Sequence, residues 1–355
     1  MTAALSFLMS FLAVLFALII EQARPLARGN WVHAGFRGWA RWSCRSLDAG
    51  KSHHGWIAWC VAVLVPAILT MAVHWLLWRI NIVLAFAWSV AILYVTLGFR
   101  QFSHYFTDLR DALDDGDEVA ARELLAQWRQ VDASDLPRSE IVRHVIEYSV
   151  LAAHRHVFGV LGWFSILAAF GLGPAGAVLY RMSEFVSRYW IYKRASAAAE
   201  GEGASPALQL AATQAWGVID YVPARLTSLG FAVVGSFEDA IDAWRSYSQR
   251  TPIVPGSTSS AFALESRNDG LILAATSGAV NVRLGGEALK TILALDPATA
   301  YTAEGLDADE RIGTEATAGR EPEVAHLRSV VGLVWRSVVL WMVLLALLTL
   351  ARLLG

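Results

Sequence analysis

The sequence predicts an all-α fold: a polytopic helical membrane protein with a cytoplasmic helical hairpin and amphipathic segments. Hydrophobic residues make up 55% of the 355 residues and charged residues only 17%, whereas soluble domains carry about 25% charged residues. Several uncharged runs also approach the roughly 20 residues that a helix needs to cross a bilayer. We therefore expect the lipid bilayer as a partner and a multi-pass protein of the bacterial inner (plasma) membrane.

The charge balance and the cysteines exclude other classes of protein. A formal net charge of −2 provides no basic field for nucleic acid, so no nucleic-acid partner is expected. Cys44 and Cys60 show neither CxxC spacing nor a paired framework, which disfavours a disulfide scaffold or a zinc ribbon.

Residues 1–99 are expected to hold three transmembrane helices. The run 4–20 favours a retained span over a signal peptide, because no basic segment precedes it and Glu21-Gln22, not a small-residue cleavage site, follows it. Further runs cover 57–78 and 82–98. Only three residues separate these two runs, which predicts a tight helical hairpin.

A basic interfacial helix is predicted within 21–56. This segment carries six Lys and Arg residues against Glu21 and Asp48, so the positive-inside rule places it in the cytoplasm and the N-terminus outside. Arg37, Arg41 and Arg45 recur every four residues and tryptophans interleave with them, as on a helix that lies in the membrane interface.

A cytoplasmic helical hairpin is predicted over 100–156. Leu109, Leu113, Leu125 and Trp128 follow a helical apolar period that Gly116 interrupts. The residue after this glycine, Asp117, is well placed to cap the second helix.

The remaining segments lead to the C-terminus. Residues 157–195 predict a broken membrane segment, in which "GLGPAG" indicates either a kinked span or a re-entrant pair of half-helices. Residues 196–329 predict a cytoplasmic or membrane-apposed helical region, and whether 207–236 crosses the bilayer stays open. Residues 330–355 predict a C-terminal transmembrane helix, in which Arg336 either snorkels or pairs with an acid on a neighbouring helix.

Motifs of metal or nucleotide chemistry are weak. The two histidines of "HRH" (154–156) point to opposite sides of a helix and cannot share one ion, so no metal site is predicted. The acidic run between 108 and 118 is typical of a solvated helix face. Neither "GLGPAG" nor "RLGG" matches a phosphate-binding P-loop.

Four pieces of the chain resemble the CobD/CbiB family of cobalamin-biosynthesis membrane proteins, in family order. The segment 94–147 ends on the pair Arg143 and Glu147. "GPAGAVLYR" (173–181), "DYVPARLTSL" (220–229), and 268–286 with its closing "GAVNVRLGG" follow. The resemblance implies an amide-forming synthase that joins adenosylcobyric acid to aminopropanol or its phosphate. It also implies a corrinoid substrate, with Mg²⁺ and ATP as cofactors if the protein is enzymatic.

The resemblance also suggests candidate site residues. Glu147 and Asp269 are the candidate catalytic residues. The candidate residues for binding substrate or phosphate are Arg181, Arg283, Asn268 and Arg225. Polar runs of the family at 151–156, 184–187 and 268–273 are mostly replaced here, so enzymatic activity is left open.

A second family, AmpE, offers an alternative function. The chain resembles AmpE in "LIIEQ", in "DYVPARL" followed by "GSFEDAIDAW", and in ending on one hydrophobic span. This resemblance implies a non-catalytic membrane sensor or regulator of cell-wall or β-lactamase signalling, in which the same polar residues hold helices together.

Overall fold

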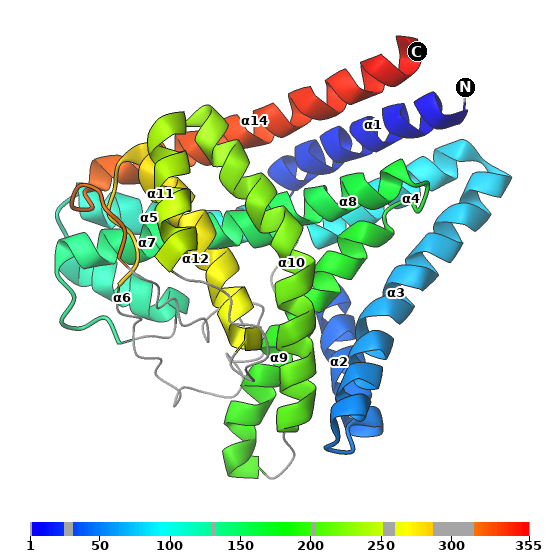
Figure 1. Cartoon of the computed structure of the whole chain (residues 1–355), viewed down its shortest axis with the longest axis horizontal. Coiled ribbons are helices and arrows are strands. Elements are labelled where there is room, and N and C mark those ends of the chain that lie inside the picture. Colours follow the sequence, from blue (N-terminus) through cyan, green and yellow to red (C-terminus); the bar gives the residue numbers. More distant parts are fainter. Residues whose placement is uncertain are drawn as a thin grey trace. The chain divides into compact units, whose positions relative to one another are not determined.

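The computed structural model describes residues 2–24, 31–129, 132–200, 204–250, 260–286 and 316–354. Within these residues the fold is all-α, as predicted: the described residues form no strand, and one isolated bridge joins Val282 to Arg320 (Figure 1). In the segment 268–286, residues 268–280 form the end of a helix that stops at Val280, and the last six residues follow that helix. The chain divides into two compact units, which are described separately.

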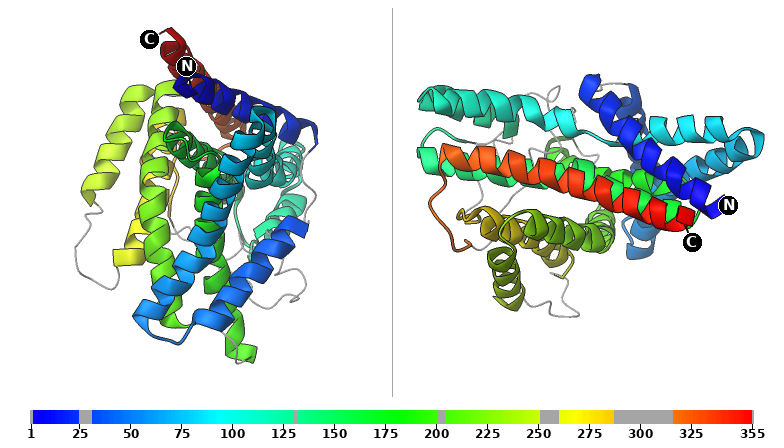
Figure 2. Two further views of the ribbon diagram at one scale, coloured as in Figure 1. Left: turned by 90° about the vertical axis from the view of Figure 1, so that its right-hand side faces the viewer. Right: turned by 90° about the horizontal axis from the view of Figure 1, so that it is seen from above.

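The first unit contains residues 1–100, 155–219 and 338–355. Its helices are α1 (Thr2–Ala23), α2 (Trp31–Leu47), α3 (Ser52–Ile80), α4 (Ile82–Thr96), α8 (Gly159–Ala169) and α9 (Ala175–Glu200). The early part of α10 (Pro206–Val234) and the late part of α14 (Val324–Leu354) also belong to it. Pairs α1–α4, α3–α9 and α8–α9 form the most extensive contacts in this unit (Figure 2).

The second unit contains residues 101–154 and 220–337. Its helices are α5 (Phe99–Asp114), α6 (Glu118–Arg129), α7 (Arg138–Ala153), α11 (Phe237–Arg250) and α12 (Ser260–Val280), together with the late part of α10 and the early part of α14. The closest pair is α11–α12. A Cβ atom at Gly278 would lie 2.3 Å from the carbonyl oxygen of Asp239, so glycine at this position permits the close packing of these two helices.

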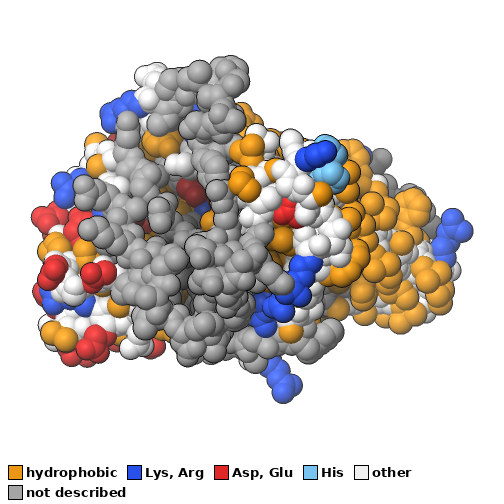
Figure 3. Space-filling model, turned by 90° about the horizontal axis from the view of Figure 1, so that it is seen from below, with side chains coloured by type: hydrophobic (Ala, Val, Ile, Leu, Met, Phe, Trp, Pro, Cys, Tyr) orange, Lys and Arg blue, Asp and Glu red, His pale blue; other side chains and the backbone are white. Residues whose placement is uncertain are grey.

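Five described helices are long and apolar enough to cross a membrane, as expected for a multi-pass membrane protein. They cover Leu5–Ala23, Ser52–Ile80, Arg138–Ala169, Pro206–Val234 and Val324–Leu354, and Ile82–Thr96 is a shorter apolar helix. Large hydrophobic side chains on α1, α3, α4 and α14 are exposed, and Figure 3 shows hydrophobic side chains gathered in a broad area on its right-hand side. Lipid is the medium that accommodates such a surface.

The two predicted hairpins are present as helical pairs. Asn81 alone separates α3 from α4, and its side-chain oxygen accepts a hydrogen bond of 2.7 Å from the amide of Val83. Between α5 and α6, Gly116 has φ +79°, and Asp117 accepts a hydrogen bond of 2.9 Å from the amide of Ala120. Both N-caps satisfy amide groups that the first helical turn leaves without a partner.

The segment 157–180 contains the end of one helix, a turn and the start of the next helix. Apolar helix already begins at Arg138 and continues through the π-helix His154–Phe158 to Ala169. The "GLGPAG" motif then forms a turn, in which Gly171 and Gly173 have φ of +76° and +58°, and α9 begins at Ala175. Positive φ angles at two glycines end the helix at this turn, so 157–180 contains a helix–turn–helix.

Two further expectations concern individual side chains. Trp39 on α2 donates a hydrogen bond of 3.1 Å to the carbonyl oxygen of Ala62 on α3, so this tryptophan contacts a neighbouring helix. Arg336 on α14 is exposed and donates a hydrogen bond of 3.1 Å to the carbonyl oxygen of Gly332 on its own helix.

Candidate functional site

The candidate site in the second unit is centred on a buried ion pair of α7. Nearly every residue of α7 from Ile141 to Leu151 is buried. Arg143 and Glu147 are four residues apart and therefore lie on one face of this helix. An Nη1 atom of Arg143 lies 3.0 Å from Oε1 of Glu147, and their side chains are only 5% and 0% exposed. Two opposite charges are thus held together away from water.

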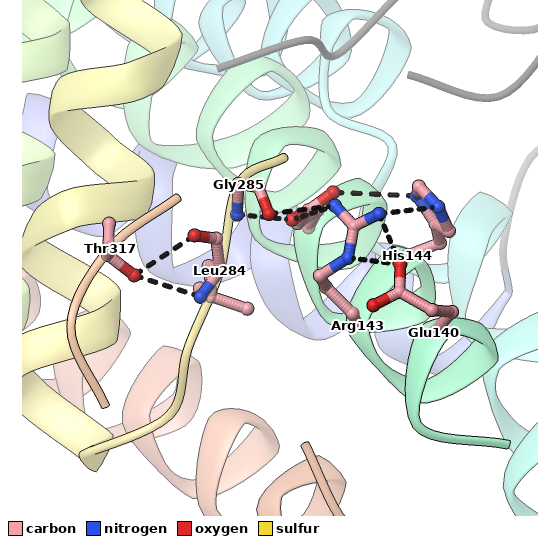
Figure 4. A network of polar contacts seen from close by, with 7 residues as sticks. Glu140, Arg143, His144, Leu284, Gly285 and Thr317 are labelled. Atoms are coloured by element: carbon pink, nitrogen blue, oxygen red, sulfur yellow. Dashed lines mark hydrogen bonds and ion pairs between the residues drawn. The ribbon is translucent and has the colours of Figure 1, made fainter. Parts of the chain in front are cut away.

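The backbone of the "RLGG" segment (residues 283–286) makes hydrogen bonds to both members of this ion pair. The amide of Gly285 donates a hydrogen bond of 2.7 Å to Oε1 of Glu147 across 138 residues of sequence. Arg143 in turn donates a hydrogen bond of 3.1 Å to the carbonyl oxygen of Gly285. Figure 4 shows these contacts. Since Gly285 and Gly286 have φ of +81° and +126°, the backbone here takes a conformation that favours glycine.

Residues 317–320 hold the "RLGG" segment in place through hydrogen bonds. The hydroxyl of Thr317 accepts from the amide of Leu284 at 2.9 Å and donates to the carbonyl oxygen of Leu284 at 3.0 Å (Figure 4). The amide of Thr317 also donates to that carbonyl oxygen at 2.7 Å. The amide of Arg283 donates to the carbonyl oxygen of Arg320 at 2.8 Å. The position of Gly285 against Glu147 therefore rests on residues that follow it by more than thirty positions.

Two more side chains surround the guanidinium of Arg143. Its Nη2 atom lies 2.5 Å from Oε2 of Glu140 and 3.0 Å from Nε2 of His144. Because a guanidinium only donates, Nε2 of His144 must accept, which leaves the proton of a neutral imidazole on Nδ1. That atom lies 3.5 Å from Oε2 of Glu147, so the imidazole faces both members of the ion pair.

Three of the residues singled out from the sequence lie together at α10 and α12. Arg225 donates to the carbonyl oxygen of Tyr221 at 2.8 Å and to the side-chain oxygen of Asn268 at 3.3 Å. Its guanidinium carbon also lies 3.3 Å from the centroid of the Tyr221 ring, a cation–π contact. Asn268 is fully buried and Asp269 is nearly so. This group is anchored on the same helix, α12, that leads into "RLGG".

The other two arginines lie elsewhere. Arg181 belongs to the first unit, where it lies 2.6 Å from Glu184, and Arg188 lies 3.2 Å from the same carboxylate. Glu184 thus binds two arginines. Arg283 is exposed; among the described residues its side chain shows no ion pair or hydrogen bond, and only its backbone joins the site.

Sequence reasoning missed a buried triad of His154, Asp220 and Thr227. Nε2 of His154 lies 2.8 Å from a carboxylate oxygen of Asp220, and Nδ1 lies 2.8 Å from the hydroxyl oxygen of Thr227. All three are buried. His154 begins the π-helix, a feature frequent at functional sites. The signal in the sequence is "DYVPARL", which contains both Asp220 and Arg225.

The positions of the His, Cys, Asp and Glu side chains determine whether the protein could bind a metal ion by itself. The described part of the chain contains no group of three or more His, Cys, Asp or Glu side chains able to hold an ion. Mg²⁺ is often held by one or two carboxylates together with phosphates of the substrate. Asp269, which follows Asn268 on α12, is a carboxylate available for this role.

Comparison with known proteins identifies the family. The family model described as CobD/Cbib protein matches residues 10–299. A protein of Stutzerimonas stutzeri named cobalamin biosynthesis protein CobD is 28% identical over 298 residues, covering 83% of this chain and 82% of the relative. A protein of Chromobacterium violaceum with the same name is 31% identical over 199 residues, 56% and 55% of the two chains.

A more distant protein of this name, from Leptospira interrogans, is 25% identical over 249 residues, covering 69% of this chain and 70% of the relative. No solved structure matches the chain. These comparisons do not favour the AmpE alternative, since the matching family and the relatives named here carry the cobalamin name. With a match over most of its length, the chain belongs to the CobD/CbiB family.

Proposed function

We propose that this protein acts in cobalamin biosynthesis as an amide-forming synthase, joining a side-chain carboxylate of adenosylcobyric acid to aminopropanol or its phosphate. The observation that carries the proposal is the hydrogen bond of 2.7 Å between Gly285 and Glu147. It joins the Arg143–Glu147 segment to the "RLGG" segment, two of the pieces on which the family resemblance rests. Two segments that resemble the family therefore contribute to the same group of polar contacts.

The chemistry sets what the site has to supply. A carboxylate becomes reactive towards an amine when it takes a phosphoryl group from a nucleoside triphosphate. The amine nitrogen then bonds to the carboxyl carbon, phosphate leaves with one former carboxylate oxygen, and the nitrogen loses a proton to a base. Cations that neutralise phosphate are therefore required, and ATP with Mg²⁺ is the donor that we propose.

The polar groups of the second unit support a division of roles. Oε1 of Glu147 accepts the amide of Gly285 and lies 3.0 Å from Arg143, so we assign Glu147 and Arg143 to positioning the "RLGG" backbone. Arg283 is exposed beside this backbone and is free to bind phosphate. Asp269, next to the Arg225–Asn268 pair, is the proposed base or magnesium ligand. Arg181 remains a proposed phosphate-binding residue of the first unit.

Complementation tests the proposal. A strain that lacks the family synthase should grow without added cobalamin when it expresses this protein, and should grow on added cobinamide with or without it. Arg283→Gln should abolish growth, because it removes the proposed phosphate-binding cation. Expression should stay normal, because the Arg283 side chain is exposed and makes no described contact. Arg110→Gln, at a partly exposed arginine of α5 paired with Asp111, should leave growth unchanged.

The outcomes separate activity from site assignment. No growth with well-expressed wild-type protein, alongside normal growth on cobinamide, would contradict the synthase function. Growth that is equal for wild type and Arg283→Gln would retain the function and remove Arg283 from the phosphate site.

A further inference from the structure

A cavity of about 480 Å³ lies in the first unit, at the end of the α3–α4 hairpin. It is bounded by the N-terminal half of α1, the ends of α3 and α8, the start of α4, and the turn between α8 and α9. Its size falls within the range of pockets that bind small molecules, about 300–1,000 Å³. The proposed synthase function assigns no role to it.

Phenylalanine and tryptophan side chains form a large part of its wall, and a few polar groups lie among them. Phe7, Trp78, Phe86 and Phe164 line it together with the hydroxyls of Ser6 and Ser10. Trp75 donates a hydrogen bond of 2.9 Å to the carbonyl oxygen of Gly171 and so ties the α8–α9 turn to α3. A wall of this kind suits a ligand with a long apolar part.

Close packing keeps one side of the cavity in a defined shape. A Cβ atom at Gly173 would lie 2.5 Å from the ring of His74, so the turn approaches α3 as closely as glycine allows. His74 is buried, and its Nδ1 lies 3.4 Å from the hydroxyl oxygen of Ser89 on α4. The cavity is therefore held by contacts from three separate elements.

One arginine lines this cavity, and a second contacts an aromatic ring of its wall. Arg79 lines it and is exposed. The guanidinium carbon of Arg352, near the end of α14, lies 5.5 Å from the centroid of the Phe7 ring, which is part of the wall. No acidic side chain lines the cavity among the described residues. An apolar interior with a cationic edge is complementary to a molecule with apolar chains and an anionic head.

The position along α3 indicates where such a molecule lies. α3 has 29 residues from Ser52 to Ile80, about 44 Å at 1.5 Å per residue, which exceeds the roughly 30 Å of the hydrocarbon core. The cavity lies near its C-terminal end and the basic segment that contains α2 precedes its N-terminal end. Exposed Trp75 and Phe170 flank it, and such aromatic rings are enriched at the level of lipid head groups.

We propose that this cavity is a binding site for an anionic phospholipid, whose acyl chain enters between the aromatic rings and whose phosphate binds Arg79 and Arg352. Phosphate pairs with both guanidinium groups, and no proton or covalent change is involved. By the predicted orientation, the lipid belongs to the leaflet opposite the basic segment 21–56.

Native mass spectrometry of the full chain in mild detergent tests the proposal. Phosphatidylglycerol and phosphatidylcholine of identical acyl chains are added in series, and inorganic phosphate is added as a third probe. Phosphatidylglycerol should bind more tightly. Each interfacial arginine contributes about fivefold, so R79Q/R352Q should weaken phosphatidylglycerol binding about 30-fold. Ala169→Phe, at an exposed position of the cavity wall, should block both lipids.

Arg336→Gln is the matched control, since Arg336 is an exposed arginine of the same helix α14 and, among the described residues, donates a hydrogen bond only to its own helix. It should bind like wild type, and circular dichroism should show equal helix content for every variant. Three results overturn the proposal: equal binding of the two lipids, equal loss in R79Q/R352Q and R336Q, or unchanged binding in Ala169→Phe. Full displacement of the lipid by inorganic phosphate would identify a free-anion site and would equally overturn it.

Discussion

Removal of either member of the Arg143–Glu147 pair should destabilise the protein, and by different amounts. Breaking a buried ion pair typically costs about 3–5 kcal/mol, because one charge stays buried without its partner. After Glu147→Gln, Arg143 still contacts Glu140 at 2.5 Å and the carbonyl oxygen of Gly285 at 3.1 Å. We therefore expect a loss near the lower limit, about 3 kcal/mol.

The converse change should cost more. After Arg143→Met, the carboxylate of Glu147, whose side chain is 0% exposed, retains the amide of Gly285 at 2.7 Å and His144 at 3.5 Å. A carboxylate with so few donors is the less favourable buried charge, so the loss should approach about 5 kcal/mol. The double variant should cost about 2–3 kcal/mol less than the sum of the single losses.

Equilibrium unfolding of the full chain in mixed micelles, with a rising fraction of sodium dodecyl sulfate, measures these free energies. Tryptophan fluorescence and circular dichroism should give coincident transitions, which licenses a two-state treatment. Glu140→Gln is the control, since the side chain of Glu140 is 31% exposed and should contribute about 1 kcal/mol or less. Strict additivity in the double variant, or single losses no larger than that of the control, would refute the proposed coupling.

Two further predictions concern packing and topology. Gly176→Ala should destabilise by about 1–3 kcal/mol in the same assay, because its Cβ would lie 2.0 Å from the carbonyl oxygen of Trp163 where α8 crosses α9. Gly332→Ala on α14, with nothing within 4 Å of its Cβ, should be neutral or stabilising. Equal effects of Gly176→Ala and Gly332→Ala on the free energy of unfolding would contradict the close packing of α8 against α9. In a background with Cys44 and Cys60 replaced by serine, Asn81→Cys should react with an impermeant maleimide in intact cells, and Arg110→Cys only after lysis. The reverse pattern would invert the predicted orientation.

Much of the fold follows from local sequence. Long uncharged runs must satisfy their backbone groups internally, so the helices at 4–20, 57–78, 82–98 and 330–354 are readable from composition alone. The caps at Asn81 and Asp117 depend on residues within three positions, and this is the range over which sequence patterns are informative.

The extent of the broken segment could not be read in this way. Residues before 157 include Arg143, Glu147 and His154, which lower the apparent hydropathy of α7. In the structure these polar groups pair with one another and with α10, so the helix is buried despite them. A residue-by-residue hydropathy cannot register a charge that a distant partner neutralises.

The sequence by itself determined the helical membrane class, the family resemblance and the placement of Arg143 and Glu147 on one helical face, because these depend on composition and on spacings of a few residues. Only the tertiary structure decided that Gly285 would contact Glu147 across 138 positions, that Asp220 would contact His154, and that Arg181 would bind Glu184. Helical periodicity specifies which residues share a face, whereas the partner of that face is selected by packing between segments remote in the chain.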